Sequence, residues 1–175
     1  MKFRILSFLV CLALVVSLIP GRAGTWFAPS LKEIIRTSDV IGIFRVVEGG
    51  TFKAKLVPVS IYKGKVKGEI WLGGFSNRYG PVDTLSVGEL YVLFVTKAKD
   101  RKSRYVSSSY KSVMPEAYEA TLYVMNRKDG YFVPTPTSGE YKVSGDKVFL
   151  DLADIKERLT GLSLEDLKRA IRTEL

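Results

Sequence analysis

The sequence has no histidine and no glutamine among its 175 residues, and its only cysteine is Cys11. Zinc sites with nitrogen or sulfur ligands, Cys-His nucleophiles and Ser-His-Asp triads all need histidine or several cysteines, so the chain excludes them. An internal disulfide needs two cysteines and is excluded as well. The fold must therefore be stabilised by its apolar core.

The chemistry that remains is a Ser-Lys dyad, a pair of carboxylates or an oxygen-liganded cation. The sequence has no G-x-S-x-G elbow, no S-x-x-K motif with supporting partners and no phosphate-binding glycine loop. We therefore expect a protein that is not an enzyme and that uses no cofactor and no metal. A hydrolase with a nucleophile among the serines at 107–109, or with paired carboxylates, stays open as an alternative.

Residues 1–23 have the pattern of a secretory signal peptide. Lys2 and Arg4 precede an apolar run at 5–19, and small residues follow it up to Ala23, after which we predict cleavage. A retained membrane anchor is the alternative, but this run is shorter than the ~20 residues that span a bilayer. The sequence predicts a secreted or periplasmic protein with no transmembrane segment after cleavage, and one domain at 24–175.

The charge balance is basic. The whole chain has 27 Lys and Arg against 18 Asp and Glu. The predicted signal contains Lys2, Arg4 and Arg22 and no acid, which leaves 24 against 18, a net charge of +6. This excess favours attraction to anionic surfaces. We expect the partner to be an extracytoplasmic protein or an anionic cell-envelope polymer, and we expect no nucleic acid; the oligomeric state is left open.

Short β-rich segments follow one helix and precede two more. Ser30 caps a predicted helix that continues to about residue 37. Two C-terminal helices are predicted, one with an apolar stripe at Leu152, Ile155 and Leu159, and one capped by Ser163. Between them, alternating and β-branched residues predict strands or hairpins at 40–64, 69–76, 89–99, 121–135 and 140–152, while 100–120 reads as a long surface excursion.

The stretch VSIYKGKVKGEIWL, residues 59–72, contains three lysines at alternate positions. Val57, Val59 and Ile61 are predicted to be buried on one strand, and Gly64 and Gly68 to reverse the chain. Pro58 indicates an edge or a bulge, since proline donates no ladder hydrogen bond. The turn would then present the lysines to solvent as a secondary basic site, at Lys63, Lys65 and Lys67.

Six or seven short strands with terminal helices predict a mainly β, α+β domain, and bent strands favour a closed barrel. The segments SDVIGIFRVVEG, VSIYKGKVKGEIWL and LSVGELYVLFV, in this order and spacing, resemble bacterial secreted domains related to tissue inhibitors of metalloproteinases and to netrin-like modules. The resemblance covers about residues 36–96. It implies an OB-like fold, a five-stranded Greek-key barrel with an N-terminal helix, an extra β-hairpin and two C-terminal helices.

The resemblance also implies an alternative function, metalloproteinase inhibition. The animal inhibitors chelate the protease zinc through an N-terminal cysteine, whereas this chain has Gly24, Thr25 and Trp26 at its predicted mature start.

The main predicted binding residues lie in KAKDRKSRY and just after it. In OB barrels the loop between the fourth and fifth strands contributes to the ligand face, where basic and aromatic side chains hold polyanions or sugars. A merely solvated loop is the alternative. The candidate residues are Lys97, Lys99, Arg101, Lys102, Arg104, Tyr105 and Tyr110.

Overall fold

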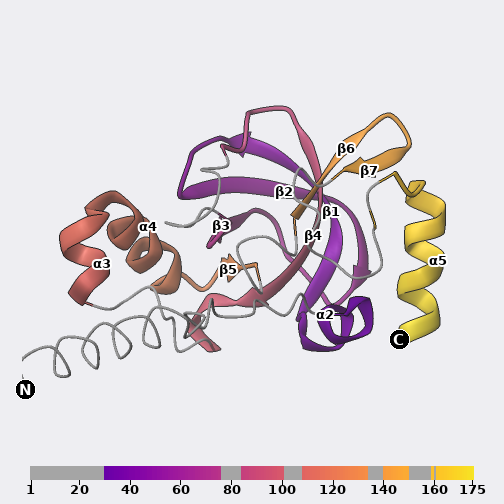
Figure 1. Ribbon diagram of the computed structural model, residues 1–175, viewed down its shortest axis with the longest axis horizontal. Helices are drawn as coiled ribbons and strands as arrows, with labels where there is room; N and C mark the ends of the chain where they lie inside the picture. Colours follow the sequence, from indigo (N-terminus) through magenta and orange to yellow (C-terminus); the bar gives the residue numbers. More distant parts are fainter. Residues whose placement is uncertain (1–29, 76–83, 101–107, 134–139, 150–158, 160) are drawn as a thin grey trace, which may run out of the picture.

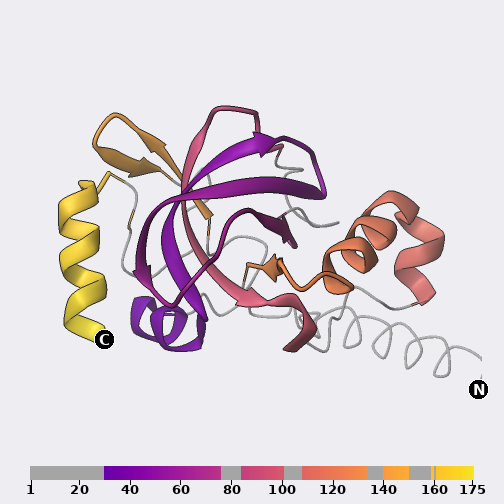
Figure 2. The same cartoon turned by 180° about the vertical axis from the view of Figure 1, so that it is seen from behind.

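The computed structural model describes residues 30–75, 84–100, 108–133, 140–149, 159 and 161–175. A closed β-barrel lies at its centre, between a pair of helices on one side and a single helix on the other (Figures 1 and 2). The barrel strands are β1 (Val40–Glu48), β2 (Lys53–Lys63), β3 (Ile70–Gly73), β4 (Leu90–Lys97) and β5 (Gly130–Phe132).

The barrel closes because β1 pairs along both of its edges. It is antiparallel to β2 on one edge and to β4 on the other. The circuit continues through an antiparallel β2–β3 pair, a parallel β3–β5 pair and an antiparallel β4–β5 pair. The strand order β1-β2-β3-β5-β4 with closure onto β1 is that of a five-stranded OB-like barrel. The predicted fold class is confirmed.

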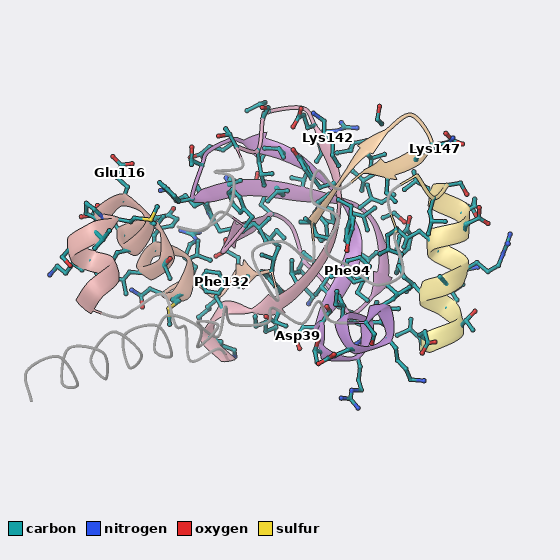
Figure 3. The ribbon with its side chains drawn as sticks, viewed as in Figure 1. Asp39, Phe94, Glu116, Phe132, Lys142 and Lys147 are labelled. Atoms are coloured by element: carbon teal, nitrogen blue, oxygen red, sulfur yellow. The ribbon has the colours of Figure 1, made fainter. Side chains whose placement is uncertain are left out.

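Alternate residues of β1 and β4 are buried on opposite faces of the barrel wall. Phe44, Val46 and Leu93 point into the barrel core, whereas Ile43 and Phe94 belong to a second apolar cluster outside it. This outer cluster also contains buried residues of α2 (Leu31–Thr37) and α5 (Leu164–Glu174), and Figure 3 labels Phe94 at the barrel wall. Both strands are therefore apolar on both faces.

The helix caps and the extra hairpin follow their local signals. Ser30 Oγ accepts a hydrogen bond from the Glu33 amide at 3.2 Å, and Ser163 Oγ accepts one from the Asp166 amide at 3.1 Å. The extra hairpin consists of β6 (Glu140–Ser144) and β7 (Lys147–Phe149), with β6 paired to β4. Gly145 has φ +63° in its turn, as expected for a tight hairpin.

The bulge predicted at Pro58 is present, but it changes which residues of β2 are buried. The β1–β2 register shifts between Ile43 and Phe44, opposite Ser60 and Pro58. Such an extra residue moves the following side chains to the other face of the strand. The bulge therefore lets Ile61 pack against the same core as Leu56. The predicted burial of Val59 is wrong, since this residue is 53% exposed: before the bulge the buried residues of β2 are Ala54 and Leu56, and not the odd-numbered ones.

The hairpin predicted at 121–135 is also wrong. Residues 121–125 form the second half of α4 (Pro115–Met125), which follows α3 (Ser108–Val113), so part of the predicted surface excursion is helical. Pro115 starts α4, and Ala117, Ala120 and Val124 share its buried face. β5 begins only at Gly130 and pairs with β3 and β4, not with residues 121–125.

Two further predictions fall outside the described residues: the signal peptide at 1–23 and most of the helix expected over 152–159. Leu159 itself is buried in the outer cluster. Within the described ranges, every helix is too short or too polar to cross a bilayer.

Candidate binding surface

Three chain segments meet at the end of the barrel where α2 lies. Lys63, the last residue of β2, donates hydrogen bonds from Nζ to the carbonyl oxygens of Ile35 at 2.6 Å and Arg36 at 3.3 Å. These carbonyls lie in the last turn of α2, where an ammonium group also complements the helix dipole. Lys63 therefore has a structural role in addition to any role in binding.

Asp39 joins the same place to β4. Its amide donates to the carbonyl oxygen of Val95 at 2.9 Å, and its Oδ2 accepts from the amide of Lys97 at 2.7 Å. Gly64, directly after Lys63, approaches so closely that a Cβ atom there would collide with the carbonyl oxygen of Asp39. Figure 3 shows Asp39 beside α2 at this end. The β2–β3 connection and the end of β4 are thus held together around one residue.

The two lysine-rich segments that the sequence assigned to separate sites therefore meet at Asp39. Lys65, Lys67, Lys99 and Arg36 are exposed, while Lys63 and Lys97 are half-buried. Among the side chains that the structure describes, which do not include that of Asp100, no carboxylate forms an ion pair with any of these cations. We call this surface the basic end, and it comprises Arg36, Lys63, Lys65, Lys67, Lys97 and Lys99.

The other predicted binding residues are not part of the described basic end. Arg101, Lys102, Arg104 and Tyr105 lie outside the described residues. Tyr110 belongs to α3, which packs against α4 and lies on the far side of α4 from the barrel (Figures 1 and 2).

A second group of side chains, which sequence reasoning missed, lies on the outer face of β2 and β3. The rings of Trp71 and Tyr123 meet edge to face, with centroids 4.9 Å apart. Lys53 Nζ lies 4.0 Å from the Tyr123 centroid and 5.3 Å from that of Trp71. The Arg127 guanidinium carbon lies 5.3 Å and 5.6 Å from the same two rings. These distances are those of cation–π contacts. We call these four residues the cation–aromatic cluster.

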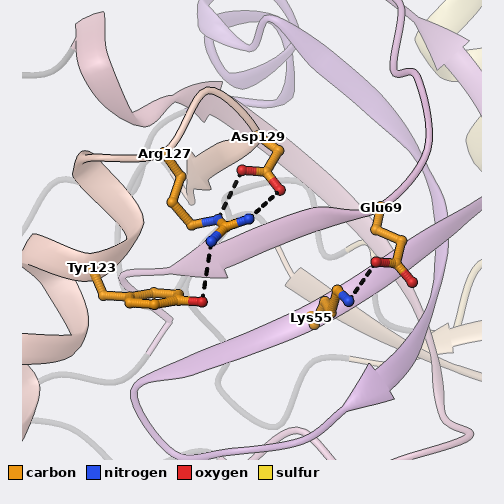
Figure 4. Close-up of polar contacts among 5 residues, drawn as sticks. All are labelled: Lys55, Glu69, Tyr123, Arg127 and Asp129. Carbon is orange, nitrogen blue, oxygen red and sulfur yellow. Dashed lines mark hydrogen bonds and ion pairs between the residues drawn. The ribbon is translucent and has the colours of Figure 1, made fainter.

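Carboxylates hold part of this cluster in place (Figure 4). Arg127 donates to the two carboxylate oxygens of Asp129 at 2.8 and 3.0 Å, and to the Tyr123 hydroxyl at 3.2 Å. These hydrogen bonds lower the pKa of Asp129. On the adjacent strands Lys55 pairs with Glu69, and the hydrogen bond between them raises the pKa of Lys55. Lys53 has no carboxylate partner among the described residues.

One signal in the sequence pointed to this surface. Lys53 and Lys55 alternate with the fully buried Ala54 and Leu56, so both lysines must lie on the outside of the barrel. The aromatic partner was hidden because Tyr123 was assigned to a strand, whereas α4 places it over Trp71.

The fold and these two surfaces define a closed OB-like β-barrel that presents cations at one end and a cation–aromatic cluster on its outer wall. In the described part of the chain, no three acidic, histidine or cysteine side chains gather in a way that could hold a metal ion. No protein-family model matches the chain, and no curated protein matches it. The resemblance to metalloproteinase inhibitors and netrin-like modules stays a prediction, and residues 24–26 lie outside the described ranges.

Proposed function

We propose that this protein is an exported, non-catalytic binding module that holds an anionic polymer of the cell envelope at its basic end. The observation that carries the proposal is the meeting of two lysine-rich segments around Asp39. Three of the lysines, Lys65, Lys67 and Lys99, are exposed, and they form no ion pair with any side chain that the structure describes. A repeating anion can contact several such ammonium groups at once, and each contact releases a condensed counterion.

The rigidity of the surface supports the same proposal. Lys63 is fixed on the carbonyls of α2, and the backbones of Gly64 and Lys97 are fixed against Asp39. The lysine stems keep their freedom, but their attachment points do not have to be ordered when a ligand binds. A binding surface that is largely formed in advance loses less affinity to ordering.

We also propose that the protein catalyses no reaction. The whole sequence has no histidine and one cysteine, so the common nucleophile and general-base pairs are missing.

The test compares two charge-reversal variants of equal charge, K65E/K67E/K99E at the basic end and R45E/K111E/K147E elsewhere. The substituted residues are all exposed. Binding of polyphosphate and of polygalacturonate is measured by calorimetry at several NaCl concentrations, with neutral dextran as a blank. We expect wild-type affinity to fall as salt rises, as counterion release requires.

The basic-end variant should lose affinity about tenfold or more, and the control variant much less, because a Debye length of about 8 Å at physiological salt makes the effect local. If the two variants lost affinity equally, binding would depend only on the net charge of the protein, and the proposed site would be rejected. Failure of the wild type to bind either polyanion would reject the function itself, and capture of an extracytoplasmic protein would then become the leading explanation for the exposed cations.

A further inference from the structure

We infer that the cation–aromatic cluster is a subsite for a sugar ring that bears a carboxylate, so that the polymer is an acidic polysaccharide containing uronate units. This inference rests on the proposed function and specifies its ligand. It uses residues outside the basic end, and the two can therefore be tested separately.

The Tyr123 ring is both exposed and held. Its residue is 38% exposed, whereas Trp71, against which it packs edge to face, is 6% exposed. Arg127 donates to the Tyr123 hydroxyl, and Asp129 fixes Arg127 by two hydrogen bonds. One face of a pyranose ring presents C–H groups and is apolar, so it can stack on an aromatic side chain, here one whose hydroxyl is already hydrogen-bonded to Arg127. A ring that is already fixed loses little entropy when it receives one.

The charge beside this ring selects the kind of sugar. Lys55 and Arg127 each have a carboxylate partner, Glu69 and Asp129. Lys53 lies over the Tyr123 ring without an ion pair to any described residue. It therefore supplies a positive charge directly beside an exposed aromatic surface. A uronate unit has the complementary arrangement, a carboxylate attached to a ring with an apolar face. Polyphosphate has the negative charge that complements Lys53, but it has no apolar ring that could stack on Tyr123.

The cluster is continuous with the basic end along the β2–β3 connection. Lys67 is two residues before Glu69, and Glu69 pairs with Lys55 across the two strands. Lys53 follows on the same face of β2, roughly 7 Å further along, since two strand residues span that length. A linear polymer lying across Lys67 and Lys55 thus reaches Tyr123. Glu69 and Asp129 lie on this path, but each is neutralised by its own cation.

The experiment uses three single variants of the protein expressed from the full-length chain: Y123A removes the ring, Y123F keeps the ring and removes the hydroxyl, and K53M keeps an apolar stem and removes the charge. Affinities are measured for oligogalacturonate and for polyphosphate. In a W26F background, Trp71 is the only tryptophan, so its emission reports ligand binding at the cluster itself. Circular dichroism and the thermal midpoint show whether each variant is folded.

We expect Y123A to weaken oligogalacturonate binding about tenfold, by analogy with the loss when one base-stacking aromatic side chain is removed from a protein that binds single-stranded nucleic acid. K53M should weaken it several-fold, and Y123F less than threefold. Polyphosphate affinity should change less than threefold in all three. Trp71 emission should respond to oligogalacturonate and not to polyphosphate.

Unchanged oligogalacturonate binding in both Y123A and K53M would overturn the inference and leave the basic end as the whole site. Equal losses for both polymers would also overturn it, because the cluster would then contribute charge alone. If Y123A proves unfolded, K53M and the Trp71 emission decide the question, since neither depends on removal of the ring. If K65E/K67E/K99E loses affinity for both polymers while Y123A and K53M bind both as the wild type does, the basic end alone is the binding site.

Discussion

Gly64 is the position at which a single methyl group should do most damage to the basic end. Its φ of +79° lies in the left-handed region, and a Cβ atom would collide with the carbonyl oxygen of Asp39. The conformation alone costs a non-glycine residue about 1–2 kcal/mol. The collision adds about 1–3 kcal/mol, the range for overpacking a fixed site. Asp39 cannot easily move away, because Val95 and Lys97 hold it from β4.

Gly68 provides a matched control for Gly64→Ala. Its φ is +77°, nearly the same, but nothing lies within 4 Å of the place that a Cβ would occupy. Gly68→Ala therefore measures the conformational cost without the collision. We expect a loss of about 1.5 kcal/mol for Gly68→Ala and about 3.5 kcal/mol for Gly64→Ala. In a domain of this size these losses correspond to decreases in thermal midpoint of about 4 °C and 10 °C.

The two variants are compared by urea denaturation and by thermal unfolding followed by circular dichroism. Equal free energies of unfolding for Gly64→Ala and Gly68→Ala would show that the close approach of Gly64 to Asp39 carries no cost. A Gly64→Ala variant as stable as the wild type would contradict the prediction as well, since the carbonyl of Asp39 would then not be fixed. Polyphosphate binding by the folded fraction shows whether the lysines keep their arrangement.

Three further changes have defined outcomes. Lys63→Met should lower the free energy of unfolding by about 1 kcal/mol, because two carbonyls of α2 lose their donor, while Lys65→Met should not change it; urea denaturation measures both. The pKa of Asp129 is lowered by its arginine partner, so its ion pair stabilises the fold above about pH 4 and this contribution disappears as the pH falls further. The stability difference between wild type and Asp129→Asn should therefore shrink between pH 6 and pH 3, and a constant difference would contradict this assignment. Leu167→Ala in α5 should cost about 2–5 kcal/mol because the side chain is fully buried, whereas Leu175→Ala, at a residue that is 62% exposed, should stay within about 0.5 kcal/mol.

The elements that the sequence predicted correctly depend on local signals. Ser30 caps α2, and Gly145 forms the tight turn of β6–β7. The error at 121–135 arose because Thr121, Tyr123 and Val124 favour strands by composition. The helix spacing of Ala117, Ala120 and Val124 was also present in the sequence, and burial against the barrel decided in favour of α4.

Asp129-Gly130 shows why a turn signal can mislead. Gly130 is the first residue of β5 and not the centre of a hairpin turn. A Cβ there would collide with the carbonyl oxygen of Val124, so the glycine is needed for the close approach of α4 and β5. A three-residue strand whose parallel partner lies almost sixty positions earlier leaves no local pattern.

The candidate site was predictable in its parts and not as a whole. Both groups of lysines were identifiable, but their meeting depends on β1 pairing with β2 and β4 at once, which is a non-local property of the closed barrel. The cation–aromatic cluster needed the correct position of α4 as well.

The outer apolar cluster makes α5 a cover for the barrel and not a part of its hydrogen-bonded wall. Every strand pairing among the described residues is made without α5, yet Leu167 and Ile171 are buried in the same apolar cluster as Val92 and Phe94. A chain that ends before α5 would therefore keep the hydrogen-bonded strand pairs of the barrel while exposing part of the outer apolar cluster. Such a fragment should form soluble aggregates or dimers through this exposed apolar surface at temperatures where its β-structure is still intact.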